Sequence, residues 1–408
     1  MSPPRKPARE TYDAEIRFDG PLGRQLPRLY LKMAWRVAPD RLRPGPSLPL
    51  RAPIHEGNGP LTLAPGTDYW PNKLLTDVAV IGYAFPPDGK PTPQMRVAVQ
   101  VGRRVKHGQV TGARRARLGR RTGTPVFSAP EPFTEMALNC DSAYGGVDPR
   151  VAPGATDEAR VLRWGMGLDH PGAYARNPFG KGYVVGALPG GKEVELPTLE
   201  APFDLLTPER LVLPDPAQWH RQPVAWCYDW MHTRMFPRLV YFRREAAPWF
   251  PPPPDELLAE QKLGLMARDL DDWRAEPPDD DDLLGMHPMF VQEASLGLSS
   301  DEVAEGCPIR LRGMHPEGRR VDFVVPPPPR VDIVVERARA QPALTLTSVE
   351  CLPADELVTM TYVAELELPR TLIPGIHKEI DIRASINGDQ PIVYEPPPTV
   401  FEQAGMNF

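Results

Sequence analysis

The clearest pattern of hydrophobic and polar positions in the chain runs from Asp77 to Gln109. Residues 77–85 are almost continuously apolar, which indicates a strand. The following Pro-Pro-Asp-Gly at 86–89 is a strong turn signal, because glycine tolerates positive φ and proline fixes the entry angle. Positions then alternate, with Met95, Val97, Val99, Val101 and Val105 on one side and Arg96, Ala98, Gln100, Arg104 and Lys106 on the other. We therefore expect a hairpin with one face on a core and one in water, surrounded by more sheet.

Similar patterns recur along the chain. Short strands are predicted at Glu15–Phe18, Leu29–Val37 and Val331–Val335. A second hairpin is predicted from Thr345–Cys351 and Leu357–Leu368, with its turn at residues 353–356. Its second arm carries an uninterrupted apolar face made of Val358, Met360, Tyr362, Ala364, Leu366 and Leu368.

Proline sets the fold class, since it makes up 54 of the 408 residues, against about 5% in an average protein. Proline disrupts helix interiors and central strands but suits turns, edges and extended connections. We predict a mainly β protein with antiparallel sheets, in a sandwich or barrel-like arrangement, with long proline-rich loops and one or two short helices. The best helix follows Pro251–Pro254, where Leu263, Met266, Leu270 and Trp273 fall at helical spacing.

The predicted organisation follows these patterns. It consists of a disordered basic arm at 1–10, a β-rich core at 11–250 with an irregular proline-rich surface excursion at 38–66, a proline-rich and helical insertion at 251–288, a β-rich continuation with the terminal hairpin at 289–395, and a loose tail at 396–408. The aromatic segment 219–242 is expected to build core. Asn177, Gly180 and Gly182 are expected to set a turn.

Charge and cysteine content favour a cytoplasmic protein. The net charge of −6 argues against a surface that grips a polyanion, and the four cysteines are widely spaced, as expected for reduced and buried thiols. The first ten residues lack the apolar region of a signal peptide, and no stretch approaches the ~20 apolar residues of a membrane helix. We expect neither a nucleic acid nor a membrane as a partner.

Searches for reactive or cofactor-binding patterns fail. The Gly180-Lys181 pair lacks the first glycine and the hydroxyl residue of a phosphate-binding loop, and the glycines at 165 and 167 lack the third glycine of a dinucleotide fingerprint. His220, Cys227 and His232 do not have the spacing of a zinc site. We expect no catalytic residue, no metal and no cofactor. One enzymatic alternative stays open, a carbohydrate-acting hydrolase in which Glu131, Glu135 and Asp141 converge on Tyr144.

A basic stretch is the candidate partner surface. Residues 102–130 contain no acidic residue, so they could dock an acidic partner, or form a solvated hairpin whose charge meets carboxylates elsewhere. The stretch has no interleaved aromatics for base stacking. The candidate partner-binding residues are Arg103, Arg104, Arg114, Arg115, Arg117 and Lys181, together with Leu263 and Met266 of the predicted helix.

Several segments, in order, resemble one bacterial family. They are DVAVIGYAFPPDGKP with MRVAVQVG, SAPEPFTEMALNCDSAYGG, YARNPFGKGYV, ELPTLEAP, YDWMHTR, FVQEASLGL, IRLRGMHPEG with VDFVVP, and the closing TLTSVECLPADELVTMTYVAEL. They cover roughly residues 15–385. This looks like the family of domain-of-unknown-function proteins encoded beside type VI secretion spike proteins and their effectors. Where the family continues after YDW with an acidic and aromatic stretch, this chain has the proline-rich FPPPPDELLAEQKLGLMARDL.

The resemblance implies a non-enzymatic adaptor or chaperone. Its partners would be an effector protein and a spike protein of the valine-glycine repeat or PAAR-tip type, bound in the cytoplasm before secretion. A structural component of a contractile injection apparatus is the third possibility. Such roles need a stiff scaffold and exposed patches rather than a reactive pocket.

Overall fold

The computed structural model describes residues 11–19, 26–39, 41–54, 65–70, 73–148, 150–151, 172–236, 238, 288–335, 337–366, 381–389 and 391–394. Within them the protein is mainly β, as predicted, with several antiparallel sheets and no closed barrel. The described helices are all short 3-10 turns: η2 (Pro87–Gly89), η3 (Cys140–Ser142), η4 (Pro216–Arg221), η7 (Pro288–Val291) and η8 (Pro353–Asp355). The predicted helix with Leu263 and Met266 lies outside the described residues, as do the basic arm at 1–10 and the tail at 396–408.

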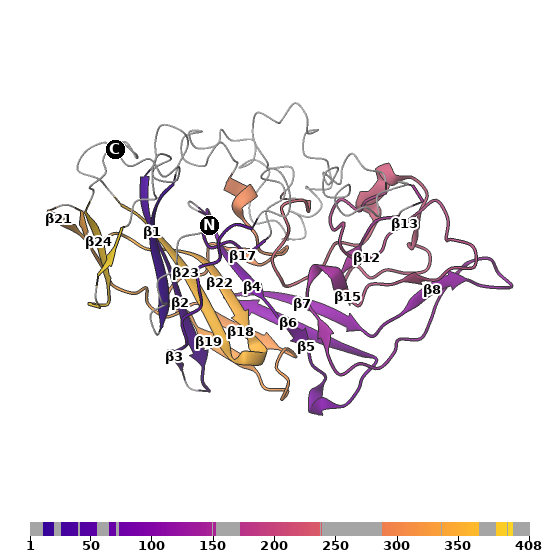
Figure 1. Cartoon of the computed structure of the whole chain (residues 1–408). Helices are drawn as coiled ribbons and strands as arrows, with labels where there is room; N and C mark the ends of the chain where they lie inside the picture. The colour runs from indigo at the N-terminus through magenta and orange to yellow at the C-terminus, as the bar shows by residue number, and fades with distance from the viewer. Residues whose placement is uncertain are drawn as a thin grey trace, which may run out of the picture.

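The largest sheet joins the two ends of the chain (Figure 1). Its strand order is β1 (Tyr12–Asp19), β2 (Leu26–Val37), β23 (Leu357–Glu365), β22 (Thr345–Leu352), β4 (Thr76–Val80) and β17 (Ser299–Ser300), with β3 (Leu42–Pro44) also on β2. The predicted terminal hairpin is confirmed as β22 and β23, joined through η8. Its second strand is buried on both faces rather than one, up to the exposed Glu365.

A second sheet lies beside the first and contains the first part of the basic stretch, in β7 (Figure 1). Its strand order is β15 (Leu199–Glu200), β7 (Arg104–Thr111), β6 (Gln94–Val101), β18 (Pro308–Arg312) and β19 (Val321–Val324). A third sheet has the order β21 (Ala338–Ala340), β20 (Val331–Val335), β24 (Ile382–Ile386) and β25 (Ile392–Val393).

Four small sheets complete the described structure. One has the order β14 (Val194–Glu195), β8 (Arg115–Leu118) and β9 (Pro125–Phe127). The others pair β5 (Tyr83–Ala84) with β10 (Met136–Ala137), β11 (Tyr144–Gly145) with β12 (Lys181–Gly182), and β13 (Val184–Val185) with β16 (Val212–Leu213). The last two pairs are parallel, which adds to the mixed character of the fold.

The prediction that residues 77–85 and 95–106 form one hairpin is wrong. β4 runs parallel to β22, far along the chain, and β6 forms its hairpin with β7 through a turn at Gly102 and Arg103. Because this turn reverses the chain, Val99 pairs with Lys106 and the two side chains share the inner face. Val105 is therefore 47% exposed and Lys106 is 5% exposed, the opposite of the predicted alternation.

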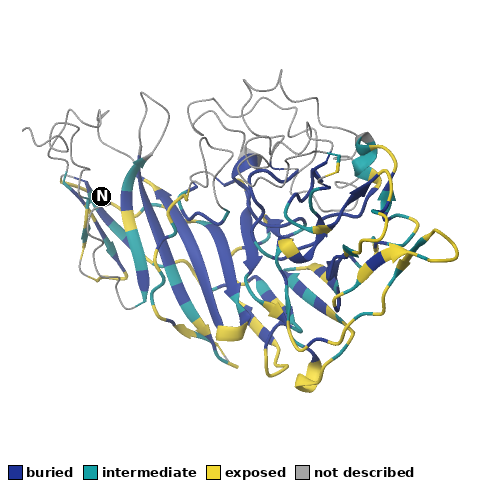
Figure 2. Cartoon of the chain, turned by 45° about the vertical axis from the view of Figure 1, so that its right-hand side comes forward, coloured by how far each residue is buried: buried dark blue, intermediate teal, exposed yellow. Residues whose placement is uncertain are grey.

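One hydrophobic core spans the three large sheets, and Figure 2 shows the buried central strands. It includes Val78, Val99, Ile309, Ile333 and Met360. The described part of the aromatic segment contributes to this core as predicted, since Trp226 and Tyr228 are buried within it, whereas Tyr241 and Phe242 lie outside the described residues. A separate cluster around Tyr144, Tyr174 and Leu211 supports the small parallel pairs.

The segment 38–66, expected to be a surface excursion, covers part of the largest sheet with its described part around Leu50. Leu50 is 3% exposed and packs with Tyr30 of β2 and Val363 of β23. The proline-rich stretch thus supplies a buried contact, because extended chain can lie flat across a sheet. Among the described residues, no helix has the length and apolar character to cross a membrane.

Candidate functional site

A buried charged cluster gathers three segments that are far apart in sequence. Asp77 begins the apolar run of β4 and has no exposed surface. Its carboxylate accepts hydrogen bonds from Lys73 Nζ at 2.7 Å, Gln292 Nε2 at 2.9 Å and Ser299 Oγ at 2.6 Å. The backbone N–H of Glu293 also donates to it, at 2.7 Å. These donors satisfy a buried carboxylate that would otherwise be costly to remove from water.

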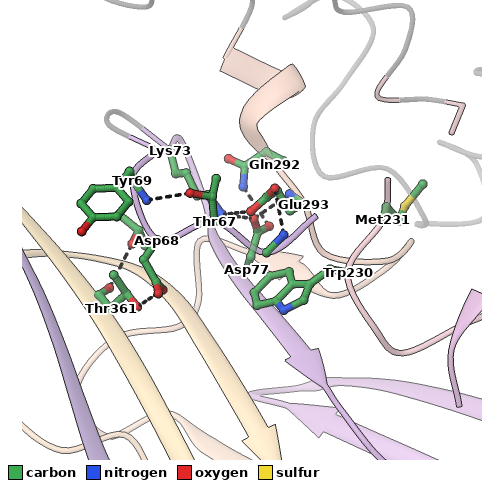
Figure 3. Close-up of polar contacts among 12 residues, drawn as sticks. Thr67, Asp68, Tyr69, Lys73, Asp77, Trp230, Met231, Gln292, Glu293 and Thr361 are labelled. Carbon is green, nitrogen blue, oxygen red and sulfur yellow. Dashed lines mark hydrogen bonds and ion pairs between the residues drawn. The ribbon is translucent and has the colours of Figure 1, made fainter. Parts of the chain in front are cut away.

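Glu293 adds a second buried carboxylate beside Asp77 (Figure 3). Its Oε1 accepts the backbone N–H of Gly66 at 3.2 Å and lies 3.5 Å from Arg238 Nη2, whereas its Oε2 has only ion-pair contact, 3.6 Å from Lys73 Nζ. Arg238 is anchored by donating to the carbonyl oxygens of Phe290 and Met231. Burial lowers the pKa of Arg238, and the neighbouring carboxylates of Glu293 and Asp77 oppose that effect. The side chains of Lys73 and Arg238 thus face the carboxylates of Asp77 and Glu293.

A second group of buried charges ties Arg51 and Asp68 to the largest sheet. Asp68 accepts from Lys32 Nζ at 2.9 Å and from Thr361 Oγ1 at 2.7 Å, on adjacent strands. Arg51 joins this group to the next strand, because its backbone N–H donates to Asp68 and its Nη2 donates to Glu350 at 2.8 Å. The covering segment is therefore fixed to three strands by side-chain hydrogen bonds.

These two groups are suited to support the fold rather than to turn over a substrate. Asp77, Glu293 and Lys73 are each nearly inaccessible, and the hydrogen-bonding capacity of Asp77 is taken up by protein groups. Buried ion pairs of this kind add little net stability over an apolar core, but removing one partner is costly. They fix which segments meet, which suits a scaffold that must keep one shape.

Sequence reasoning missed the Asp77 cluster, although the signal was present. Asp77 opens an apolar run, and Gln292-Glu293 interrupts another in FVQEASLGL. Charged or amide groups inside buried strands require partners. The segments quoted for the family resemblance are those that meet here, yet nothing local shows which segment pairs with which.

Asn177 sets a turn, as predicted, and is fully buried. Its Nδ2 donates to the carbonyl oxygen of Cys140 at 2.7 Å, and its Oδ1 accepts from the backbone N–H of Phe179. Its own carbonyl oxygen approaches Gly145 so closely that a Cβ there would lie 2.1 Å from it. The AYGG and NPFGKG segments are therefore two halves of one tightly packed backbone crossing.

The candidate partner residues fall into two separate patches. Arg103 and Arg104 lie at the start of β7, where Arg103 pairs with Glu302 at 2.9 Å. Arg114 follows the far end of the same strand, whose eight residues span roughly 25 Å at the usual rise of a strand. Arg114 is half-buried and pairs with Glu200 at 2.6 Å, so it supports the fold.

The second patch includes Arg115 and Lys181, which both meet acidic residues near β14. Arg115 pairs with Glu193 at 3.3 Å and Lys181 with Glu195 at 3.2 Å, and all four side chains are solvent-accessible. Part of the basic charge therefore meets carboxylates elsewhere in the protein. Such exposed pairs contribute little to stability and exchange readily with other partners.

The tip of this region is the arginine hairpin, defined as residues 115–127. It projects from the right-hand end of the molecule in Figure 1 and is mostly exposed in Figure 2. Arg117, Arg120 and Arg121 are exposed and have no hydrogen bond or ion pair with the described side chains. Leu118 and Val126 beside them are 39% and 43% exposed. The hairpin thus combines cations and aliphatic surface that the fold does not use.

The residues of the enzymatic alternative do not come together. Glu131, Glu135 and Asp141 are exposed, whereas Tyr144 is buried and donates to Gln222 Oε1 at 3.1 Å. Burial raises the pKa of Tyr144. The predicted convergence of these carboxylates on Tyr144 is therefore not observed.

The candidate metal-like grouping is also dispersed. Cys227 lies against Cys140. The pKa of His232 is lowered to about 3, first by burial and then by the nearby positive charges of Arg234 and Arg238. No group of three or more histidine, cysteine or acidic side chains suited to a metal occurs among the residues that the structure describes.

Lys106 is a buried cation that the alternating pattern had placed on the face opposite the valines. Its Nζ donates to the carbonyl oxygens of Cys227 at 2.6 Å and Leu296 at 2.7 Å, and to Ser295 Oγ at 3.0 Å. It also lies 4.4 Å from the centre of the Trp226 ring. Burial lowers the pKa of Lys106 to about 8. The lysine links β7 to FVQEASLGL and to Cys227, the residue before YDWMHTR.

Together these features define a multi-sheet β protein whose internal charges are used to hold distant segments together. The chain belongs to the family described as uncharacterized proteins conserved in bacteria, DUF2169, whose model matches residues 28–363. The match covers both buried charged groups and the arginine hairpin. Neither a curated protein nor a solved structure matches the chain.

Proposed function

We propose that this protein is a non-enzymatic adaptor or chaperone of type VI secretion, which binds an effector and helps to load it onto the spike protein in the cytoplasm. The resemblance of its ordered segments to accessory proteins encoded beside spikes and effectors is the reason for naming this system. The buried charged groups support the proposal, because they stiffen a scaffold whose role is to hold another polypeptide.

The observation that carries the proposal is the arginine hairpin. Three arginines and two aliphatic side chains are presented on a projecting element of a protein whose net charge is −6. Arginine is enriched at protein interfaces, where its guanidinium pairs with carboxylates while its stem packs on apolar surface. The matching partner is an acidic polypeptide segment with some apolar side chains.

The test is recovery of partners from the native cell by a tagged full-length chain. The hairpin variant Arg117→Glu, Arg120→Glu and Arg121→Glu is compared with a control variant Arg96→Glu, Arg320→Glu and Arg339→Glu. All six arginines are exposed. Both variants replace three arginines with glutamates, so they change the net charge equally. We expect wild type and control to recover an effector or a spike protein, and the hairpin variant to recover at least about tenfold less.

Two outcomes contradict the proposal. Wild-type protein that recovers neither an effector nor a spike protein argues against the adaptor role itself. Equal recovery by the two variants argues against the hairpin as the docking element. Loss of bound nucleic acid, with unchanged recovery of proteins, would assign the hairpin to a different class of partner.

A further inference from the structure

Two cysteines from distant segments meet in the interior. Cys140 lies in η3 and Cys227 lies 87 positions later, yet their Sγ atoms are 2.8 Å apart. This is close to the ~2.05 Å of a disulfide bond, and both side chains are buried. We propose that Cys140 and Cys227 are a reversible dithiol–disulfide pair that cross-links these two segments on oxidation.

The backbone around both cysteines is already held in place for a bond. The carbonyl oxygen of Cys140 accepts Asn177 Nδ2 at 2.7 Å, and the carbonyl oxygen of Cys227 accepts Lys106 Nζ at 2.6 Å. The two segments also pair directly, because the backbone N–H of Tyr228 donates to the carbonyl oxygen of Leu138 at 2.9 Å. These contacts keep the two cysteines side by side, so side-chain rotation is the motion that would close the remaining distance between the sulfurs.

Both cysteines are buried, Cys227 more deeply than Cys140, so we place the attack of Cys140 first. Cys140 is 9% exposed and Cys227 is 1% exposed. With a small-molecule disulfide as the oxidant, the Cys140 thiolate attacks one of its sulfurs and displaces a thiolate. Cys227 then attacks the Cys140 sulfur of the mixed disulfide and displaces the second thiolate. The two protons lost by the cysteines go to the two released thiolates, and two electrons pass to the oxidant.

The charged surroundings make this exchange dependent on pH. The hydrogen bond with Cys227, followed by burial, raises the pKa of Cys140, so little thiolate forms at neutral pH. The nearby Lys106 favours the thiolate of Cys140, whereas the carboxylate of Asp229 opposes it. The rate of oxidation should therefore increase steadily as the pH rises from 7 to 9.

The cross-link has a structural consequence. It would join the segment NCDSAYGG to the segment WCYDW, which the native contacts already hold together. A bond that closes so long a loop restricts the unfolded chain and raises the midpoint of thermal unfolding. The pair would stay reduced in a reducing cytoplasm and oxidise once the protein reached an oxidising environment.

The experiment uses the reduced full-length chain, which has four free cysteines. It is incubated with oxidised glutathione at pH 8.5, quenched in acid, unfolded and labelled with a maleimide. We expect two labels instead of four, on Cys307 and Cys351, and a cross-linked peptide containing Cys140 and Cys227 in the mass spectrum. The midpoint of thermal unfolding should rise by on the order of 5 °C and fall back on reduction.

Matched variants keep the result interpretable. Cys307→Ser with Cys351→Ser should still lose both of its remaining labels, whereas Cys140→Ser should keep all three of its labels. The proposal is overturned if the wild-type chain keeps four labels, if a cross-link involves Cys307 or Cys351, or if Cys140 carries glutathione with no bond to Cys227. The label count of wild type decides the matter even where a variant fails to fold.

Discussion

Lys73 Nζ lies 2.7 Å from Asp77 Oδ2, and neither side chain has significant contact with solvent. The two residues are four positions apart, but only Asp77 belongs to a strand. Glu293, more than two hundred residues later, contacts both of them through its backbone N–H and its carboxylate. This small group therefore fixes how β4, the segment before it and the FVQEASLGL segment are placed.

The first prediction concerns the charge of Asp77. Asp77→Asn keeps the shape of the side chain but leaves Lys73, whose side chain is buried, without its closest anion. We expect a loss of about 3 to 5 kcal/mol in the free energy of unfolding, measured by urea denaturation. Asp322→Asn is the control, since Asp322 forms an exposed pair with Arg312 and its loss should have little effect. Equal effects of the two substitutions would argue against a structural role for the cluster.

A second prediction tests the backbone crossing at Gly145. Its φ of +153° and the 2.1 Å distance from a Cβ to the carbonyl oxygen of Asn177 leave no room for a side chain. Gly145→Ala should destabilise the protein by more than about 3 kcal/mol, through the clash and the lost hydrogen bonds around Asn177. Gly123 has a φ of +67°, and a Cβ added there would have no atom within 4 Å, so Gly123→Ala should cost only about 1 kcal/mol. Thermal unfolding of both variants gives the comparison.

The third prediction concerns pH and Lys106. Its pKa is about 8 in the folded protein, against 10.5 as the usual value, so the unfolded chain binds more protons between these values. Stability from this group therefore increases as the pH rises from about 8 to 10.5. Lys106→Met keeps the length of the side chain and removes the titration.

The measurement for Lys106 is the free energy of unfolding of wild type minus that of Lys106→Met, obtained from urea denaturation at several pH values. We expect this difference to grow between pH 7 and pH 10, by an amount on the order of 3 kcal/mol in free energy. A difference that stays constant over this range would show that Lys106 has an ordinary pKa in the folded protein.

Asp229 gives a prediction of the opposite sign. Burial raises its pKa to about 6, while the hydrogen bond from the Trp230 N–H acts against that shift. The folded protein therefore binds more protons than the unfolded chain between pH 3.8 and 6, and stability from this group decreases as the pH rises through that window.

Asp229→Asn should remove this penalty. At pH 7 we expect the variant to be more stable than wild type in urea denaturation, because a neutral amide replaces a buried charge. At pH 4 the two should be nearly equal. A variant that is less stable at pH 7 would show that the charge of Asp229 has a favourable partner in the folded state.

The sequence by itself determined the features that depend on neighbours along the chain. The terminal hairpin followed from two alternating runs and the turn at Pro353–Asp355, and the β-rich class followed from proline content. The turn role of Asn177 and the burial of the aromatic segment also came from local chemistry. Each of these depends on residue type and short spacing, which the sequence shows directly.

Only the tertiary structure decided which distant segments meet. No pattern in residues 77–85 shows that β4 pairs in parallel with β22 rather than with its neighbour β6. The two-residue turn at Gly102 then put Lys106 inside and Val105 outside, because a strand alternates every residue and a shift of the turn reverses every side chain after it. The Asp77 cluster and the contact of Cys140 with Cys227 depend on such long-range pairing. Local sequence sets the faces and turns of strands, whereas the partners of buried charges and thiols follow from the global packing of the sheets.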